Sequence, residues 1–76
     1  MKRSVDARGR SCPIPIVELM RATNEAAVGD EIEVLSDDRA FPADVRAWCS
    51  KTGHTLVSLE PQGAAHAALV RKEEVG

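Results

Sequence analysis

Cys12 is the residue whose type and surroundings point most directly to chemistry in this chain. It stands within the string RGRSCPIP of residues 8–15, directly before a stretch with helical hydrophobic periodicity. Proline fits the first turn of a helix, where backbone N–H groups have no intrahelical partner. We therefore expect Cys12 at the N-cap of a helix and Pro13 as its first residue. Because a helix N-terminus carries partial positive charge, it favours the thiolate, which is the reactive form of cysteine.

The neighbours of Cys12 favour an exposed sulfur nucleophile or a cysteine persulfide. Pro13 and Pro15 stiffen the turn and have no N–H, so we expect the free donors near the sulfur to be those of Ile14 and Ile16. We expect Arg8 and Arg10 to add positive charge that stabilises the thiolate. Acyl transfer by a Cys–His pair is disfavoured because no histidine lies nearby in the sequence. The structural alternative is that Cys12 only caps the helix, although Ser, Thr, Asp and Asn are better caps.

The elements that must position Cys12 follow from the spacing of apolar residues. Alternation predicts strands, and spacings of three and four predict helices. In chain order we expect a strand at 5–7, a helix from Pro13 to Gly29, a strand at 31–36, a second helix that starts between Asp38 and Pro42 and ends at Gly53, a strand at 54–60, a turn at 61–63 and a strand at 65–72. The predicted buried stripes are Ile16, Leu19, Met20, Thr23 and Ala27 on the first helix, and Phe41, Val45, Trp48, Cys49 and Thr52 on the second.

This β-α-β-α-β-β order predicts a single α/β (α+β) domain over residues 1–76, folded as a two-layer sandwich. We expect a four-stranded mixed sheet with two helices on one face, because each helix links two strands. Both crossovers should be right-handed, and the last two strands should form an antiparallel hairpin. The opposite face of the sheet is expected to meet solvent or a partner.

Composition narrows the class of function. The chain has 76 residues, a formal net charge of −2, no tyrosine, one phenylalanine and one tryptophan. A chain of this size buries only about 60% of its unfolded surface, which disfavours a deep pocket built from many residues. The acidic balance disfavours direct nucleic-acid binding. No segment has transmembrane length or the pattern of a secretory signal, so we predict a cytoplasmic protein with reduced thiols and no membrane contact.

The second cysteine and the two histidines are predicted to be structural. Cys49 lies on the predicted buried stripe of the second helix, which favours a small core side chain over a disulfide partner of Cys12. His54 and His66 are expected at strand edges and not as catalytic bases. The spacings among these four residues match no common zinc site, so we predict no metal ligand.

The charged clusters are also interpreted as structural. Asp37 and Asp38 are expected to cap the second helix, with Asp44 in its first turn, where acids complement the helix dipole. We prefer this interpretation to a carboxylate metal site. The Arg71-Lys72 pair is predicted to be a solvated strand end, with docking of an acidic partner as the alternative.

The motif Gly9-x-x-Cys12-Pro13-x-Pro15 resembles the signature of the TusA/SirA-like sulfur carriers. The resemblance continues through Val5-Asp6-Ala7-Arg8-Gly9, Gly29-Asp30, Asp37-Asp38, Asp44-Val45, Trp48-Cys49, Gly53-His54 and Val70-Arg71-Lys72, so it covers nearly the whole chain. The chain departs from the family pattern at Arg39, where a proline is frequent, and at Arg10-Ser11, where an apolar residue commonly follows the glycine. The second departure changes the charge beside Cys12 and leaves the choice of partner open.

The resemblance implies a sulfurtransferase of the carrier type in which Cys12 is catalytic. Cys12 would accept sulfane sulfur from a cysteine desulfurase or a rhodanese, hold it as a persulfide and pass it to an acceptor protein. Destinations in the family include tRNA thiolation, molybdenum cofactor synthesis and dissimilatory sulfur oxidation. No metal or organic cofactor is implied.

Two other classes of function stay open at this point. A binding or regulatory module would use the free sheet face or the first helix, with Cys12 merely structural. A thiol redox sensor would use Cys12 together with Cys49. The free sheet face permits either a monomer or a weak dimer.

Overall fold

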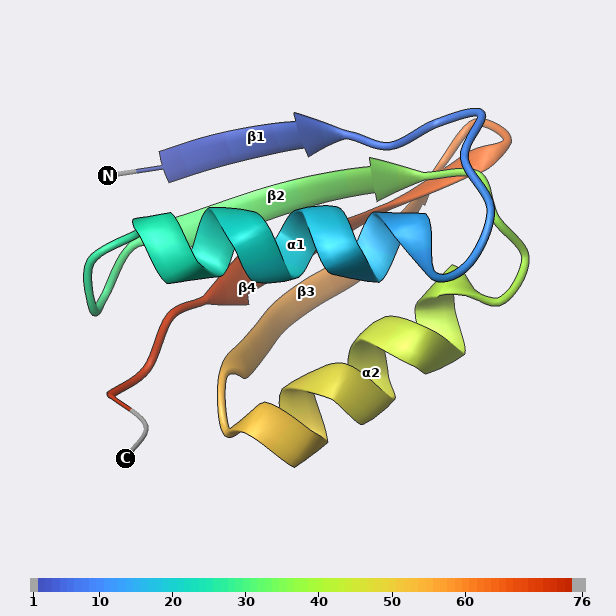
Figure 1. Ribbon diagram of the computed structural model, residues 1–76. Helices are drawn as coiled ribbons and strands as arrows, with labels where there is room; N and C mark the ends of the chain where they lie inside the picture. The colour runs from blue at the N-terminus through green and yellow to red at the C-terminus, as the bar shows by residue number, and fades with distance from the viewer. Residues whose placement is uncertain (1, 75–76) are drawn as a thin grey trace.

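The computed structural model describes residues 2–74, which form one sheet and two helices (Figure 1). The elements in chain order are β1 (Lys2–Asp6), α1 (Ile14–Glu25), β2 (Glu31–Ser36), α2 (Phe41–Thr52), β3 (Thr55–Gln62) and β4 (Ala65–Arg71). This is the predicted β-α-β-α-β-β order. Within these residues, neither helix is long and apolar enough to cross a membrane.

The four strands lie side by side in the order β1-β2-β4-β3. β1 pairs in parallel with β2, whereas β4 runs antiparallel to both β2 and β3. β3 is therefore parallel to β2, with β4 inserted between them. Figure 1 shows α1 and α2 in front of the same face of the sheet. The predicted mixed sheet with both helices on one face is confirmed.

The core lies between this face of the sheet and the two helices. Alternate residues of β2 point into it, and Ile32 and Val34 are fully buried. Leu19 of α1 and Phe41 and Val45 of α2 are fully buried as well. Burial of a large apolar side chain is worth about 1.5–3 kcal/mol, so contacts of this kind hold both helices on the sheet.

Helix α1 differs from its predicted extent. It begins at Ile14 with Pro13 as its N-cap, and it ends at Glu25 because Ala26 adopts an extended conformation. The expectation that Pro13 is the first helical residue is therefore wrong by one position. Cys12 precedes the N-cap instead of occupying it.

The buried face of α1 is narrower than predicted. Leu19 and Thr23 are buried and Ile16 is half-buried, as expected, but Met20 is 43% exposed and Ala27 is exposed beyond the helix end. The buried residues of α1 are spaced by four: Pro15, Leu19 and Thr23. Met20 and Ala27 lie outside this row, so the prediction that they are buried is wrong.

Two basic side chains satisfy carbonyl groups at the C-terminal end of α1. Arg3 donates a hydrogen bond to the Glu25 carbonyl at 3.0 Å, and Lys72 donates one to the Ala26 carbonyl at 2.7 Å. Carbonyls at a helix end lack intrahelical partners and carry partial negative charge. The prediction of a solvated strand end is therefore wrong for Lys72, which stabilises the end of α1.

Helix α2 starts and ends near the predicted residues, but its N-cap differs from the prediction. The N-cap is Ala40, with no side-chain capping bond, so the prediction that Asp37 or Asp38 caps this helix is wrong. Asp44 stands in the first turn as predicted. Gly53 ends the helix as predicted, with a φ of 88° that glycine adopts without Cβ strain.

The β3–β4 hairpin is longer than predicted and its turn is tighter. Residues 61–62, predicted in the turn, pair with residues 65–66. Pro61 is tolerated there because β3 is an edge strand. Gly63 and Ala64 form the turn, and the φ of 63° at Gly63 suits the first central position of a type II′ turn.

Replacing Leu19 by alanine should lower the free energy of unfolding by about 2–5 kcal/mol, because this side chain is fully buried. Met20→Ala, one position along the same helix, removes a side chain that is 43% exposed and should cost less than about 1 kcal/mol. Urea titration followed by circular dichroism measures both values. Equal losses at the two positions would contradict the observed orientation of α1.

Candidate functional site

The loops that follow β1 and β2 form the candidate active site. Because β1 and β2 are parallel neighbours, their C-terminal ends lie side by side and both loops start at the same end of the sheet. The Gly9 N–H donates a hydrogen bond to Asp37 Oδ1 at 3.0 Å, which ties the loop before α1 to the loop before α2. Gly9 has a φ of 81°, which residues with a Cβ rarely adopt. This tie helps to place Cys12 against the first turn of α2.

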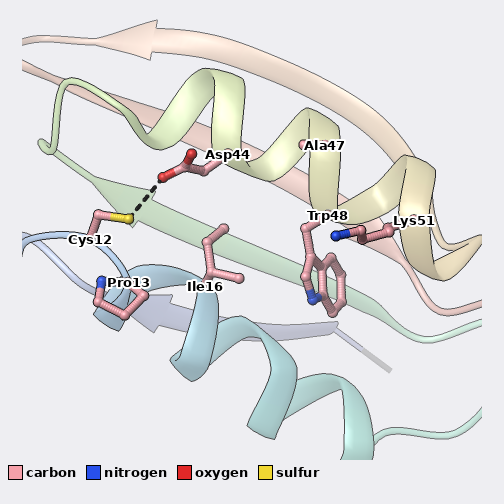
Figure 2. Close-up of a pocket in the computed structure, with 7 residues that line it drawn as sticks. All are labelled: Cys12, Pro13, Ile16, Asp44, Ala47, Trp48 and Lys51. Atoms are coloured by element: carbon pink, nitrogen blue, oxygen red, sulfur yellow. Dashed lines mark hydrogen bonds between the residues drawn. The ribbon is translucent and has the colours of Figure 1, made fainter.

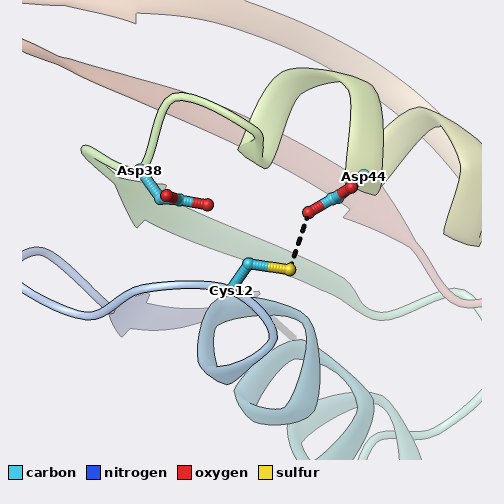
Figure 3. Close-up of side chains that lie close together, drawn as sticks. All are labelled: Cys12, Asp38 and Asp44. Carbon is cyan, nitrogen blue, oxygen red and sulfur yellow. Dashed lines mark hydrogen bonds between the residues drawn. The ribbon is translucent and has the colours of Figure 1, made fainter.

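The Cys12 thiol meets the Asp44 carboxylate, which projects from the first turn of α2 (Figure 3). The thiol donates a hydrogen bond to Asp44 Oδ2, with a distance of 3.1 Å between sulfur and oxygen. Cys12 is exposed and Asp44 is half-buried. Asp38 lies close by, and one polar atom from each of the three side chains falls within 4.8 Å of the other two. Asp38 Oδ2 is buried and has no hydrogen-bond partner among residues 2–74.

These acidic surroundings favour the protonated form of the Cys12 sulfur. The hydrogen bond to Asp44 raises the pKa of the Cys12 thiol above its ordinary value, and desolvation and the negative charges of Asp44 and Asp38 act in the same direction. The expectation that the surroundings of Cys12 lower the pKa of its thiol is therefore wrong. Carboxylates face the sulfur, and Cys12 lies outside the helix whose N-terminus was expected to stabilise it. The proton must leave when the sulfur reacts, and Asp44 is placed to accept it.

Arg8 pairs with Asp6 at the start of the loop between β1 and α1. Its guanidinium donates hydrogen bonds of 3.0 and 2.8 Å to the two Asp6 carboxylate oxygens, and this contact lowers the pKa of Asp6 to about 2. Arg10 is exposed, and within residues 2–74 its side chain forms no hydrogen bond or ion pair. An effect of either arginine on Cys12 stays a prediction.

The prolines stand at the start of α1, with one difference from the expected hydrogen bonding. Pro15 is fully buried in the first turn of α1, and the Cys12–Pro13 peptide bond is cis. The Ile14 N–H, expected to be free near the sulfur, instead donates to the Ser11 carbonyl at 2.9 Å. One of the backbone donors expected to stabilise a thiolate is therefore already occupied.

An open groove of about 300 Å³ begins at Cys12 and runs between the two helices (Figure 2). Its lining residues are Cys12, Pro13 and Ile16 on the α1 side and Asp44, Ala47, Trp48 and Lys51 on the α2 side. Figure 2 shows Trp48 and Lys51 at the far end of the groove from the sulfur, with Ile16 between them and Cys12. The Cys12 sulfur therefore opens onto a surface that another molecule can occupy.

The sequence did not lead us to expect Asp44 beside Cys12 or Lys51 in the groove. Asp44 was expected only to complement the helix dipole, and Trp48 only to fill the core. The spacing of Asp44, Trp48 and Lys51 at i, i+4 and i+7 places them on one helical face, which is a signal that the sequence does contain. No local pattern shows that Cys12, 32 residues before Asp44, faces that side chain.

The other residues considered from the sequence lie away from the Cys12–Asp44 contact. Cys49 is 5% exposed within the core cluster, which confirms its predicted core position, and burial raises the pKa of its thiol. His54 stacks on Trp48 with a ring-centroid distance of 5.4 Å, and its Nδ1 accepts a hydrogen bond from the Glu73 N–H. His66 lies near the hairpin end of β4.

Cys12, Asp38 and Asp44 are the described residues whose donor atoms converge closely enough to hold a cation. A thiolate and two carboxylates are metal ligands in chemical terms, but structural zinc sites use four protein ligands. The thiol also uses its proton in the bond to Asp44. The expectation that the chain carries no resident metal stays a prediction.

Comparison with known sequences identifies similar proteins over nearly the whole chain. The family model described as sulfurtransferase TusA matches residues 3–72. A protein of Archaeoglobus fulgidus, whose name proposes a sulfur carrier, is 37% identical over 68 residues, which are 90% of this chain and 93% of that protein. YrkF of Bacillus subtilis, whose name proposes the same role, is 32% identical over 68 residues, which are 90% of this chain and 37% of that longer protein.

The fold also has a counterpart among solved structures. The crystal structure of a SirA-like protein from Desulfitobacterium hafniense matches with a TM-score of 0.80. The match covers 95% of this chain and 99% of that chain at 22% sequence identity. The two chains therefore share the same arrangement of four strands and two helices.

Replacing Asp44 by asparagine should speed the alkylation of Cys12. Removing the carboxylate removes the largest cause of the raised thiol pKa, so the pKa falls and the thiolate fraction at about pH 7.5 increases. We expect a several-fold faster reaction with iodoacetamide, followed by intact mass, and a rate profile shifted to lower pH. Glu60→Gln, at an exposed site of β3, makes the same change in net charge and should leave the rate unchanged. An unchanged rate for Asp44→Asn would contradict the assigned contact.

Proposed function

The chain belongs to the TusA family of sulfurtransferases, and from that premise we propose that it carries sulfur as a persulfide on Cys12 and passes it to a partner protein. The observation that supports this most strongly is the exposed Cys12 thiol, held against Asp44 at the end of an open groove. The names of its relatives propose sulfur carriage, which agrees with this role. Of the two cysteines in the chain, Cys49 is buried, so Cys12 is the accessible sulfur.

Loading of Cys12 is a sulfur exchange with no net oxidation or reduction. The Cys12 sulfur attacks the outer sulfur of a donor persulfide, a new S–S bond forms on Cys12, and the S–S bond of the donor breaks. The donor cysteine leaves with the electron pair and takes up a proton. Asp44 accepts the Cys12 proton as the new bond forms. In delivery, an acceptor thiolate attacks the outer sulfur and Cys12 becomes the leaving group.

This reaction depends on presentation of the sulfur more than on an enclosed pocket. The hydrogen bond between Gly9 and Asp37 and the buried Pro15 hold the turn that carries Cys12. A sulfur held in one place loses less freedom when a partner docks, which favours exchange. Its exposure lets a donor and an acceptor reach the same atom in turn.

The proposed partners follow from the chemistry of this exchange. A cysteine desulfurase or a rhodanese suits the donor role because each presents a protein-bound persulfide, and a sulfur-acceptor protein receives the product. The same exchange serves tRNA thiolation, cofactor synthesis and sulfur metabolism, so the acceptor defines the pathway. The step needs no resident cofactor and no direct contact with nucleic acid or membrane. A reducing cytoplasm keeps an exposed free thiol reduced, and the chain acts as a monomer or a weak dimer.

A non-catalytic binding module is the alternative, and one observation favours it. The hydrogen bond from Cys12 to Asp44 joins two loops, which is a structural contribution. Serine can donate a hydrogen bond to the same carboxylate. Cys12→Ser should therefore preserve the function of a binding module, whereas it should abolish sulfur carriage.

The direct test of sulfur carriage is the intact mass of reduced protein after incubation with a cysteine desulfurase and free cysteine. We expect a gain of one sulfur atom that a reductant removes and that Cys12→Ser lacks. Cys49→Ala is the matched control, and it should load normally when circular dichroism shows that it is folded. Failure of both this donor and a thiosulfate-fed rhodanese to load Cys12 would contradict the proposal.

Replacing Arg8 and Arg10 together by alanine tests whether their charges act on Cys12. Removing two positive charges near the turn should disfavour the thiolate and slow alkylation by iodoacetamide about two- to threefold at about pH 7.5 and low salt. Arg8→Ala alone removes one of the two charges and leaves Arg10 in place, so it should have a smaller effect. An unchanged rate in the double variant would exclude both arginines from the mechanism.

A further inference from the structure

We propose that the groove beside Cys12 binds an extended segment of the partner protein in which an acidic residue lies three positions from the reacting cysteine. The inference rests on the proposed function and adds the chemistry of the partner surface. Three features of the groove support it: its opposite charges at the two ends, its length and its apolar wall.

The charges at the two ends of the groove have opposite signs. Asp44 and Asp38 surround the sulfur at one end, whereas Lys51 lines the other. Asp44 already accepts the thiol hydrogen bond. The Lys51 side chain is exposed and takes part in no hydrogen bond or ion pair within the described chain. An unpaired ammonium group at this end attracts an acidic group of a docking partner.

The length of the groove follows from the helix that forms one wall. Asp44 and Lys51 are seven positions apart within α2, so they are separated by about 10 Å along the helix axis. An extended chain advances about 3.3–3.6 Å per residue. Three residue steps therefore cover the distance from the Cys12 end to Lys51. When a partner cysteine reaches Cys12, the partner residue three positions along the chain therefore lies beside Lys51.

Apolar side chains line the groove from the sulfur to Lys51 and form its apolar wall. Ile16 from α1 lies between the charged ends, and Trp48 from α2 lies beside Lys51 (Figure 2). His54 stacks on the Trp48 ring at 5.4 Å and is itself held by the Glu73 N–H at 3.1 Å. The ring is therefore positioned before a partner arrives, which lowers the entropic cost of docking. This wall suits an apolar side chain in the middle of the segment.

Exchange with synthetic peptides measures this preference without a natural partner. One pair of tetrapeptides has the sequence Cys-Ala-Leu-Glu or Cys-Ala-Leu-Lys, and a second pair has the reverse order, Glu-Leu-Ala-Cys or Lys-Leu-Ala-Cys. All four peptides are acetylated at the N-terminus and amidated at the C-terminus. Each cysteine is activated as a mixed disulfide with 2-thiopyridine. Cys12 attacks the peptide sulfur, the peptide–pyridine S–S bond breaks, and thiopyridone leaves with the electron pair and a proton. Its absorbance reports the rate.

In at least one of the two orders, we expect the glutamate peptide to react about threefold faster than the lysine peptide at low salt, and the difference to vanish at about 1 M salt. Lys51→Glu should reverse the preference. Arg46→Glu makes the same charge change at an exposed site of α2 that does not line the groove, and it should leave the preference intact. Equal rates for both peptides, or equal shifts in both variants, would overturn the proposal.

A substitution in the apolar wall separates docking from simple access to the sulfur. Trp48→Leu should slow exchange with the glutamate peptide about threefold while the small neutral reagent dithiodipyridine reacts at the unchanged rate. Circular dichroism confirms that the variant is folded. Equal slowing of the peptide and the small reagent would overturn the proposal, because the wall would then only control access.

A second copy of this chain is the competing occupant of the groove. Gel filtration that shows a dimer dissociated by Lys51→Glu would assign the groove to that copy and overturn the proposal. The peptide assay requires no persulfide, so the two proposals fail separately. If Cys12 cannot be loaded but still prefers the glutamate peptide, only sulfur carriage is rejected. If Cys12 loads normally but shows no preference for the glutamate peptide, only the proposed partner segment is rejected.

Discussion

The parallel pairing of β1 with β2 brings the two loops of the site together. Parallel neighbours start their following loops at the same end of the sheet, and they require a crossover such as α1 between them. The Gly9–Asp37 hydrogen bond then joins these loops, and the first turn of α2 brings Asp44 to Cys12. If the same two strands were antiparallel, the loops that follow them would start at opposite ends of the sheet. The thiol and the carboxylate would then be far apart.

The chemistry at Cys12 combines exposure with protonation. An exposed thiolate reacts with any electrophile in solution, whereas a thiol bonded to a carboxylate reacts more slowly until its proton is removed. The contact with Asp44 supplies both the bond that holds the proton and the base that can accept it. The free Cys12 thiol is therefore held in a form that reacts slowly until its proton passes to Asp44.

Features with a strong local signal were predictable from the sequence. The alternation of Ile32 and Val34 with polar residues gives β2 its observed bounds, and Gly53 ends α2 as its backbone freedom allows. The motif around Cys12 pointed to this thiol but not to its charge environment. That environment depends on Asp44, whose approach is set by strand pairing and loop path and not by any spacing along the chain. The same limit explains Lys72, whose partner at Ala26 lies 46 residues earlier.

Release of sulfur from the loaded protein shows directly whether the sulfur on Cys12 is in transit. Protein carrying radiolabelled sulfane sulfur is separated from its donor and mixed with cyanide in a single turnover, with the label followed on the protein and in thiocyanate. We predict that the label leaves as thiocyanate, one sulfur per Cys12, and that the regenerated thiol can be loaded again. Label that stays on the protein, or a Cys12 that cannot be loaded a second time, would contradict it.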